Sequence, residues 1–276
     1  MAAKIVSDKV SGIDVLSLAE CMRALEYSIL ANQPINLLGP PGIGKSAIVS
    51  MVAAKLKMPF EPLILSLCDP TDIGGFPVST GGGTTGGLGS INRLPLGSIK
   101  RACNEAVILF LDELTCASPA VQGAALRLVY ERWAGDVKLH PGTRIVAAAN
   151  PPEQASGGWE LSLPHLGRMT QVNMRPKHQE VQDYFYDLDA KFETVNGERT
   201  RVAAPTTTVQ GLATDFAATI EMAPDLLCID PPPGTSSSGK AWGAPRSWER
   251  GIRVLAEAID KNEQDSGPVF AALLAG

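Results

Sequence analysis

Short apolar segments alternate with longer amphipathic segments through the first 175 residues. Mostly apolar runs of this length are typical of buried parallel strands. We predict strands at 35–38, 63–67, 106–111, 144–149 and 170–174, and helices at 16–30, 47–57 and 120–131. Ser118-Pro119 supplies an N-cap and a first-turn proline for the last of these helices. The alternation predicts an α/β fold: a parallel sheet with helices on its faces, an αβα core.

The pattern changes after residue 175, where no strongly apolar strand recurs. Helical spacing predicts helices at 178–192, 209–222, 248–260 and 269–274, separated by turn-rich stretches such as PPPGTSSSGK at 231–240. We therefore predict two domains, an α/β domain over 1–175 and a smaller, mainly helical domain over 176–276.

A glycine-rich tract separates the second predicted strand from the third. Residues 70–99 contain nine glycines and few charges. One interpretation is a flexible loop without a function. The other is a mobile loop that contacts a substrate or a neighbouring subunit, because long glycine-rich loops are uncommon in compact domains without a use.

Composition narrows the class of protein. The chain has 276 residues, of which 45% are hydrophobic and 19% charged, as in globular proteins. The net charge of −5 gives no global attraction to nucleic acid, and no Lys/Arg cluster stands out. Neither a secretory signal nor an apolar run of the roughly 18 residues that a membrane helix needs is visible. Five scattered cysteines favour reduced thiols, and hence a cytoplasmic protein, over disulfides or zinc.

Residues 39–46, GPPGIGKS, fit the phosphate-binding pattern G-x-x-x-x-G-K-[ST] at every position. Glycines let backbone N–H groups turn toward a phosphate chain, Lys45 reaches its terminal phosphates, and the Ser46 hydroxyl ligates Mg²⁺. The helix that follows adds its positive end. We predict that the nucleotide contacts Gly39, Pro40, Pro41, Gly42, Ile43, Gly44, Lys45, Ser46 and Ala47.

Polar residues follow two of the buried strands. Asp112 and Glu113 come directly after 106–111, and Asn150 follows 144–149. The carboxyl ends of strands in an α/β sheet point at the ligand crevice. We expect Asp112 to hold Mg²⁺, Glu113 to polarise the attacking water, and Asn150 to orient that water beside the γ-phosphate.

These elements together resemble an AAA+ ATPase, and more narrowly the MoxR-like group. The resemblance rests on GPPGIGKS, VILFLDEL, IVAAANPPE and APRSWERGIRVL, in this order, and covers about residues 14–260. The resemblance to the MoxR-like group rests on four features: an acidic pair, a helix with Gln122, a glutamate at 131 and a strand ending in Asn150-Pro151. The chain departs from that group at Leu114-Thr115-Cys116 and at Gly167-Arg168-Met169.

The resemblance implies roles for individual residues. Asn150 corresponds to the sensor-1 residue, and Arg246 to the sensor-2 arginine, which reaches from a helical lid to the γ-phosphate. Arg168 lies where such proteins place the arginine finger that acts on a neighbour's nucleotide, with Arg132 and Arg144 as alternatives. The glycine-rich tract falls where the MoxR-like group carries an insert, and Phe76 is the residue that we expect to contact a client.

The function implied is an ATP hydrolase, with ATP and Mg²⁺ as cofactors, that remodels or activates a protein partner. By the same resemblance it forms a ring, a hexamer, and its client is a von Willebrand factor A domain protein. Two alternatives stay open: a nucleic-acid motor or loader, disfavoured by the acidic charge, and a non-hydrolysing nucleotide-dependent scaffold. No base-reading motif separates ATP from GTP, and the sequence names no client or pathway.

Overall fold

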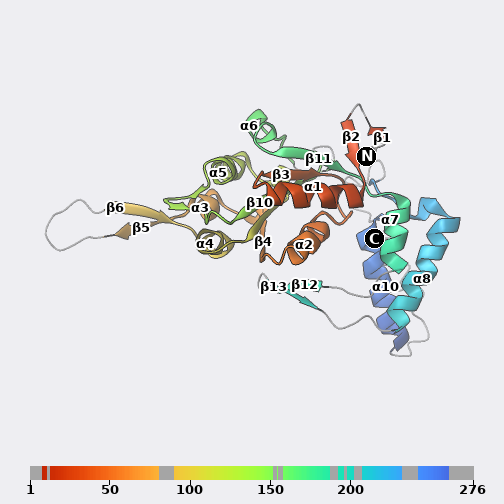
Figure 1. The fold of residues 1–276 in the computed structure, drawn as a ribbon. Coiled ribbons are helices and arrows are strands. Elements are labelled where there is room, and N and C mark those ends of the chain that lie inside the picture. The colour runs from red at the N-terminus through yellow and green to blue at the C-terminus, as the bar shows by residue number, and fades with distance from the viewer. Residues whose placement is uncertain are drawn as a thin grey trace. The chain divides into compact units, whose positions relative to one another are not determined.

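The computed structural model describes residues 8–10, 13–80, 90–151, 154, 158–186, 192–195, 198–201, 207–231 and 242–260. Its main feature is a seven-stranded sheet (Figure 1). The strands lie in the order β1 (Asp8–Val10), β2 (Ile13–Leu16), β11 (Thr170–Met174), β3 (Ile35–Leu38), β10 (Arg144–Ala149), β7 (Ile108–Asp112) and β4 (Phe60–Ile64). β1 is antiparallel to β2, and the six strands from β2 to β4 are parallel.

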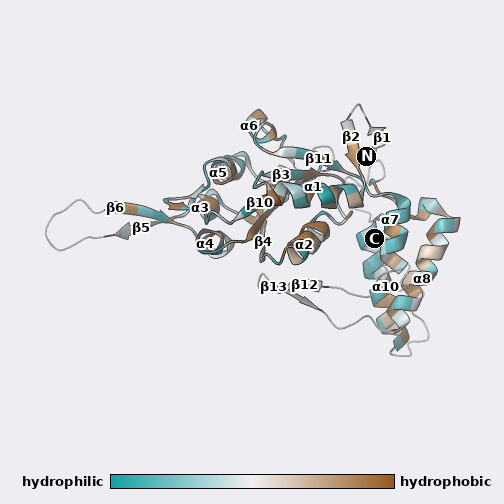
Figure 2. Ribbon diagram, in the orientation of Figure 1, coloured by the Kyte–Doolittle hydropathy of each residue, from teal (hydrophilic) through white to brown (hydrophobic). Residues whose placement is uncertain are grey.

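Strands β7 and β10 are hydrophobic along most of their length. Every residue of β10 after Arg144 is buried, and every residue of β7 before Asp112 is buried. Figure 2 shows β10 dominated by hydrophobic residues. A strand covered on both faces gains from a continuous apolar run, and these two strands lie side by side within the sheet, between β3 and β4. The first polar side chain of β7 is therefore the one at its carboxyl end.

Helices connect the strands, and the described residues also form three separate two-stranded antiparallel sheets. The α-helices are α1 (Leu18–Leu30), α2 (Lys45–Lys55), α3 (Pro70–Gly74), α4 (Gly97–Asn104), α5 (Pro119–Tyr130), α6 (Leu163–Leu166), α7 (His178–Tyr186), α8 (Thr207–Met222) and α10 (Pro245–Asp260). The 3₁₀-helices are η1 (Leu65–Leu67), η2 (Leu114–Cys116) and η4 (Pro224–Leu226). The hairpins pair β5 (Phe76–Thr80) with β6 (Ser90–Leu94), β8 (Trp133–Ala134) with β9 (Val137–Lys138), and β12 (Phe192–Val195) with β13 (Glu198–Arg201).

The chain divides into two compact units. The α/β unit comprises residues 22–38 and 46–172, and the helical unit comprises residues 1–21, 39–45 and 173–276. In the α/β unit, α3, α4 and α5 pack on β7 and β10 around a buried core that includes Ile73, Ile99, Leu109, Leu128 and Ala147. The same unit carries the β5–β6 hairpin, which extends away from this core (Figure 1).

Aromatic side chains join α7, α8 and α10, which are described helices of the helical unit. The Phe185 ring on α7 meets the Phe216 ring on α8 edge-on, with ring centroids 4.9 Å apart. Phe216 in turn lies 4.3 Å from the Trp248 ring of α10. Burying rings of this size supplies much of the apolar area that a small helical cluster needs. Among the described residues, no helix is both long and apolar enough to cross a membrane.

Most of the predicted elements are confirmed, including the strands at 35–38, 144–149 and 170–174. The helix predicted at 120–131 is α5, and its predicted cap is present: the Ser118 hydroxyl accepts a hydrogen bond from the Val121 N–H at 3.4 Å. Helices at 178–192, 209–222 and 248–260 correspond to α7, α8 and α10 with shifted ends. The helix predicted at 269–274 lies outside the described residues.

Two local predictions were wrong. The strand expected at 63–67 ends at Ile64, because its partner β7 ends at Asp112, the residue paired with Ile64. Residues 65–67 form η1 instead. The tract at 70–99 is no plain loop, since α3, β5, β6 and the start of α4 occupy its two ends. Its middle, residues 81–89, lies outside the described residues.

Candidate functional site

The glycine-rich loop joins β3 to α2, as its motif requires. Gly42 and Gly44 have φ values of 83° and 93°, a left-handed conformation that side chains with a Cβ rarely adopt. Pro40 and Ile43 are buried, whereas Ala47 is exposed on the first turn of α2. That turn contains no acidic residue, so its positive end is not offset by a carboxylate of its own.

Lys45 is held inside the loop that precedes it. Its side-chain ammonium donates to the carbonyl oxygens of Gly39 at 2.6 Å and Pro40 at 2.9 Å. The residue is 7% exposed. A cation so buried is stabilised by these carbonyl dipoles, and an anion beside the loop would stabilise it further.

The start of α10 contacts the same loop within the helical unit. Arg246 is the second residue of α10, and its backbone N–H lies 3.4 Å from the Gly42 carbonyl oxygen. A Cβ on Gly42 would lie 3.2 Å from the Ala244 Cβ and 3.8 Å from the Arg246 Cβ. The loop and the first turn of α10 therefore pack closely, which places the Arg246 backbone at the loop. Its proposed contact with phosphate stays a prediction.

In the α/β unit, Ser46 and Asp112 face each other. The Ser46 hydroxyl lies 3.4 Å from the Asp112 Oδ2, and the Asp112 Oδ1 accepts from the Glu113 backbone N–H at 2.9 Å. Mg²⁺ prefers oxygen ligands and is usually bound by one or two carboxylates together with waters and substrate phosphates. A hydroxyl and one carboxylate at this spacing fit such an ion, so these two residues are the candidate metal ligands.

Glu113 has an unusual backbone conformation. Its φ and ψ are 57° and 39°, the left-handed region, between the end of β7 and the start of η2. Its side-chain carboxylate accepts a hydrogen bond from the hydroxyl of Ser66, in η1. Sequence analysis missed Ser66, which is 47 residues away along the chain. The break of β4 after Ile64 allows this contact, because η1 then turns toward the end of β7.

Asn150 directly follows β10, and its backbone is fixed by Thr115. The Thr115 hydroxyl donates to the Asn150 carbonyl oxygen at 3.0 Å and accepts from the Asn150 N–H at 3.1 Å. Thr115 is 1% exposed. It belongs to the Leu114-Thr115-Cys116 stretch, where the chain departs from the MoxR-like pattern. That departure is the one signal in the sequence that could have drawn attention to it.

Cys116 lies beside the same group of residues. Burial raises the pKa of its thiol, the Glu113 carboxylate raises it further, and a hydrogen bond with Asn150 acts in the opposite direction. The raised pKa keeps this sulfur in the neutral thiol form at pH 7, so it adds no negative charge near Asp112 and Glu113.

Three arginines were candidates for the finger, and the structure separates them. Arg132 donates to the carbonyl oxygens of His140 and Thr143, and Arg144 donates to those of Ile29 and Pro141. Arg132 thereby contacts the segment between β9 and β10, and Arg144 contacts this segment and the end of α1. Arg168 is exposed and donates from Nη1 to the Pro164 carbonyl oxygen at 3.2 Å. Of the three arginines, Arg168 is the exposed one, whereas Arg132 and Arg144 are half-buried.

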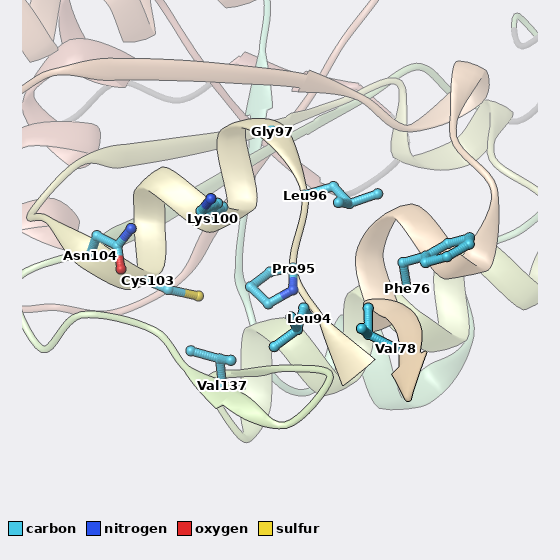
Figure 3. A pocket seen from close by; sticks show the side chains of 10 residues that line it. All are labelled: Phe76, Val78, Leu94, Pro95, Leu96, Gly97, Lys100, Cys103, Asn104 and Val137. Atoms are coloured by element: carbon cyan, nitrogen blue, oxygen red, sulfur yellow. The ribbon is translucent and has the colours of Figure 1, made fainter. Parts of the chain in front are cut away.

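The root of the β5–β6 hairpin lines a pocket of about 440 Å³ (Figure 3). Its lining residues are Phe76, Val78, Leu94, Pro95, Leu96, Gly97, Lys100, Cys103, Asn104 and Val137. The Phe76 side chain, 53% exposed, lies at one side of the pocket, and Lys100 is its charged lining residue. Exposed apolar groups gathered in this way are typical of surfaces that bind other proteins.

A comparison with family models gives one match. Residues 34–169 match the model described as AAA domain (dynein-related subfamily), a span just short of half of the chain. This span contains Lys45, Ser46, Asp112, Glu113 and Asn150. Among curated proteins, none matches the chain.

Solved structures resemble the chain in fold at low sequence identity. A mutant of RuvB from Thermotoga maritima matches with a TM-score of 0.50 and 14% identity, over 93% of this chain and 71% of that chain. NtrX from Brucella abortus in complex with ATP matches with a TM-score of 0.48 and 17% identity, over 93% of this chain and 55% of that chain. The chain thus spans about half of NtrX.

The predicted fold class is confirmed. The chain has the P-loop α/β fold of AAA+ proteins, a parallel six-stranded sheet with helices, followed by a helical C-terminal part. The narrower MoxR-like assignment and the boundary at residue 175 stay predictions.

Proposed function

We propose that this chain is an AAA+ ATPase of the MoxR-like kind, which hydrolyses ATP in a ring oligomer to remodel or activate a protein partner. The observation that carries the proposal is the group formed by Ser46, Asp112, Glu113 and Ser66 at the carboxyl ends of β7 and β4. A carboxylate for the metal and a second carboxylate for water, placed next to each other after a phosphate-binding loop, suit phosphoryl transfer to water.

Each residue has a distinct part in this mechanism. The backbone N–H groups of Gly42, Ile43 and Gly44 and the Lys45 ammonium bind the β- and γ-phosphates. Ser46 and Asp112 hold Mg²⁺, which neutralises charge on the phosphates when bound. Glu113 accepts the proton of the attacking water as its oxygen adds to the γ-phosphorus, and ADP leaves. Asn150, its backbone held by Thr115, orients that water.

The Ser66 hydroxyl occupies one oxygen of the Glu113 carboxylate. While this hydrogen bond is formed, that oxygen is not free to accept a proton from the attacking water. We infer that the pair must separate, or the second oxygen must act, before water is activated. The left-handed backbone at Glu113 directs its side chain away from the axis of β7, so the carboxylate can contact either the Ser66 hydroxyl or the attacking water.

We further propose that Arg168 acts on the nucleotide of a second copy of this chain. It is exposed, lies just after α6, and is held by neutral groups. The remaining parts of the proposal rest on the resemblance: a hexameric cytoplasmic ring, a helical lid over 176–276 that carries Arg246, ATP as the nucleotide, and a von Willebrand factor A domain client.

If Arg168 acts between subunits, the isolated chain is a poor enzyme. We expect the ATPase activity per subunit to rise at least tenfold as protein concentration is raised from nanomolar to micromolar, because association supplies the arginine. This is checked by measuring steady-state phosphate release and the oligomeric state of the protein, from its mass in solution, at the same concentrations. If the activity per subunit stays constant while the mass shows that the chains assemble, Arg168 does not act on a neighbouring subunit.

The hairpin pocket is our candidate for client contact. We expect Phe76→Ser to weaken client binding about tenfold or more, because an aromatic side chain buried in an interface contributes roughly 1.5–3 kcal/mol. Ile91→Ser is the matched control, since Ile91 is 69% exposed on the same hairpin and does not line the pocket. Binding is measured with a protein from a neighbouring gene that carries the D-x-S-x-S motif. Equal loss in both variants would contradict a specific role for the pocket.

A further inference from the structure

A tyrosine ring supports the guanidinium of Arg168. Tyr130 is the last residue of α5, and Arg168 follows α6 by two residues. The Arg168 Cζ lies 4.5 Å from the centroid of the Tyr130 ring. This distance is within the range of about 6 Å over which a cation is attracted to the face of an aromatic ring. The two residues come from different elements, so the contact is a tertiary one.

The backbone on either side of Arg168 is fixed. His165, which is 2% exposed, lies with its Nδ1 3.0 Å from the Ser162 hydroxyl, and the Arg168 N–H donates to the His165 carbonyl oxygen at 3.2 Å. Met169, on the other side, is 5% exposed. The remaining conformational freedom of Arg168 is therefore mainly that of its long side chain, and the contact with the Tyr130 ring limits it.

The acidic residue next to this contact already forms an ion pair with another arginine. Glu131, next to Tyr130, pairs with Arg127 at 2.9 Å between Nε and Oε2. Within the described residues, Arg168 takes part in no ion pair with a carboxylate, unlike Arg101, which pairs with Glu61 and Glu105. A carboxylate would compete with an incoming phosphate for the guanidinium. A neutral ring holds the same group without cancelling its charge.

We propose that Tyr130 is a positioning residue that keeps the Arg168 guanidinium ordered and uncompensated for an anion presented by a second copy of the chain. The ring face is the feature that matters, because the Tyr130 side chain remains 65% exposed and the stacking needs no hydroxyl. The anion is the terminal phosphate of the neighbour's nucleotide, so this part of the inference rests on the proposed function.

Two substitutions at residue 130 separate the ring from the hydroxyl. We expect Tyr130→Phe to keep wild-type turnover within about twofold, and Tyr130→Ala to lower kcat about fivefold while the Kd for ATP is unchanged, because a cation–π contact at an exposed site contributes about this factor. Tyr27→Ala is the matched control: Tyr27 is 68% exposed on α1. In an Arg168→Ala background, Tyr130→Ala should have no further effect, since it acts through that arginine.

A second measurement reports the contact without any hydrolysis. The side-chain N–H signal of Arg168, assigned by its absence from Arg168→Ala, should move on Tyr130→Ala because the ring current is lost, and should stay on Tyr130→Phe. If the wild type releases no phosphate but this signal moves, the proposed function fails and the contact stands. If the wild type is active, Arg168→Ala is slow and Tyr130→Ala is normal, the positioning role is overturned. An additional loss in the double variant would also overturn it.

Discussion

A Glu113→Gln variant is expected to bind ATP as tightly as the wild type and to hydrolyse it about 10²–10⁴ times more slowly. The range is the usual contribution of a positioned general base. Glutamine keeps the size of the side chain and still accepts a hydrogen bond from Ser66, so the fold around η1 and β7 should be preserved. What is lost is an oxygen basic enough to take a proton from water.

Binding of a fluorescent ATP analogue and single-turnover phosphate release measure the two effects separately. Lys45→Ala is the contrasting variant, because it removes the ammonium that we place on the phosphates and should therefore lose binding itself. Ser66→Ala removes the donor to Glu113 and should leave turnover equal to the wild type or faster. Normal hydrolysis by Glu113→Gln would remove Glu113 from the mechanism, and strong loss in Ser66→Ala would show that Ser66 has a part other than holding this carboxylate.

An Arg168→Ala variant is expected to lose about 10³–10⁵ in turnover, the contribution of an arginine finger in related P-loop proteins. Its own Lys45, Ser46, Asp112 and Glu113 are unchanged, so the Kd for ATP should stay within about threefold. Arg23→Ala is the control, since Arg23 is an exposed arginine of α1. Equal loss in both variants would point to a general effect of surface charge.

Mixing two inactive variants tests whether the arginine acts between subunits. Arg168→Ala retains Glu113, and Glu113→Gln retains Arg168, so a mixed ring contains some sites with both groups. We expect ATPase activity to reappear on mixing and to be greatest near equal proportions. Failure of any mixture to exceed the sum of its parts, while mass measurement shows mixed rings, would contradict action in trans.

The sequence was a sound guide wherever local chemistry decides structure. Mostly apolar runs predicted β3 and β10 at their observed ends, because a strand covered on both faces consists mainly of apolar residues. Ser118 and Pro119 predicted the start of α5. The strand–loop–helix around Lys45 followed from its motif, since few other sequences combine two left-handed glycines with a helix start.

Predictions from the sequence were wrong where the pairing between strands decides the structure. The β5–β6 hairpin was hidden in a glycine-rich tract, because its strands are short and exposed and are held by each other, Phe76 opposite Leu94 and Thr80 opposite Ser90. The end of β4 was misplaced because β7, and not the composition of LILSL, determines where pairing stops.

By itself, the sequence determined the phosphate-binding loop, the α/β class and the placement of Asp112, Glu113 and Asn150 at strand ends, because each depends on residues a few positions apart. Only the tertiary structure decided which side chains contact the candidate site residues: Ser66 contacts Glu113, Thr115 contacts Asn150, and Tyr130 contacts Arg168. It also shows that Arg132 donates to the Thr143 carbonyl oxygen and Arg144 to that of Ile29 in α1, and Arg168 stays our proposed finger. Such contacts join residues far apart in sequence, and packing of the whole unit brings them together.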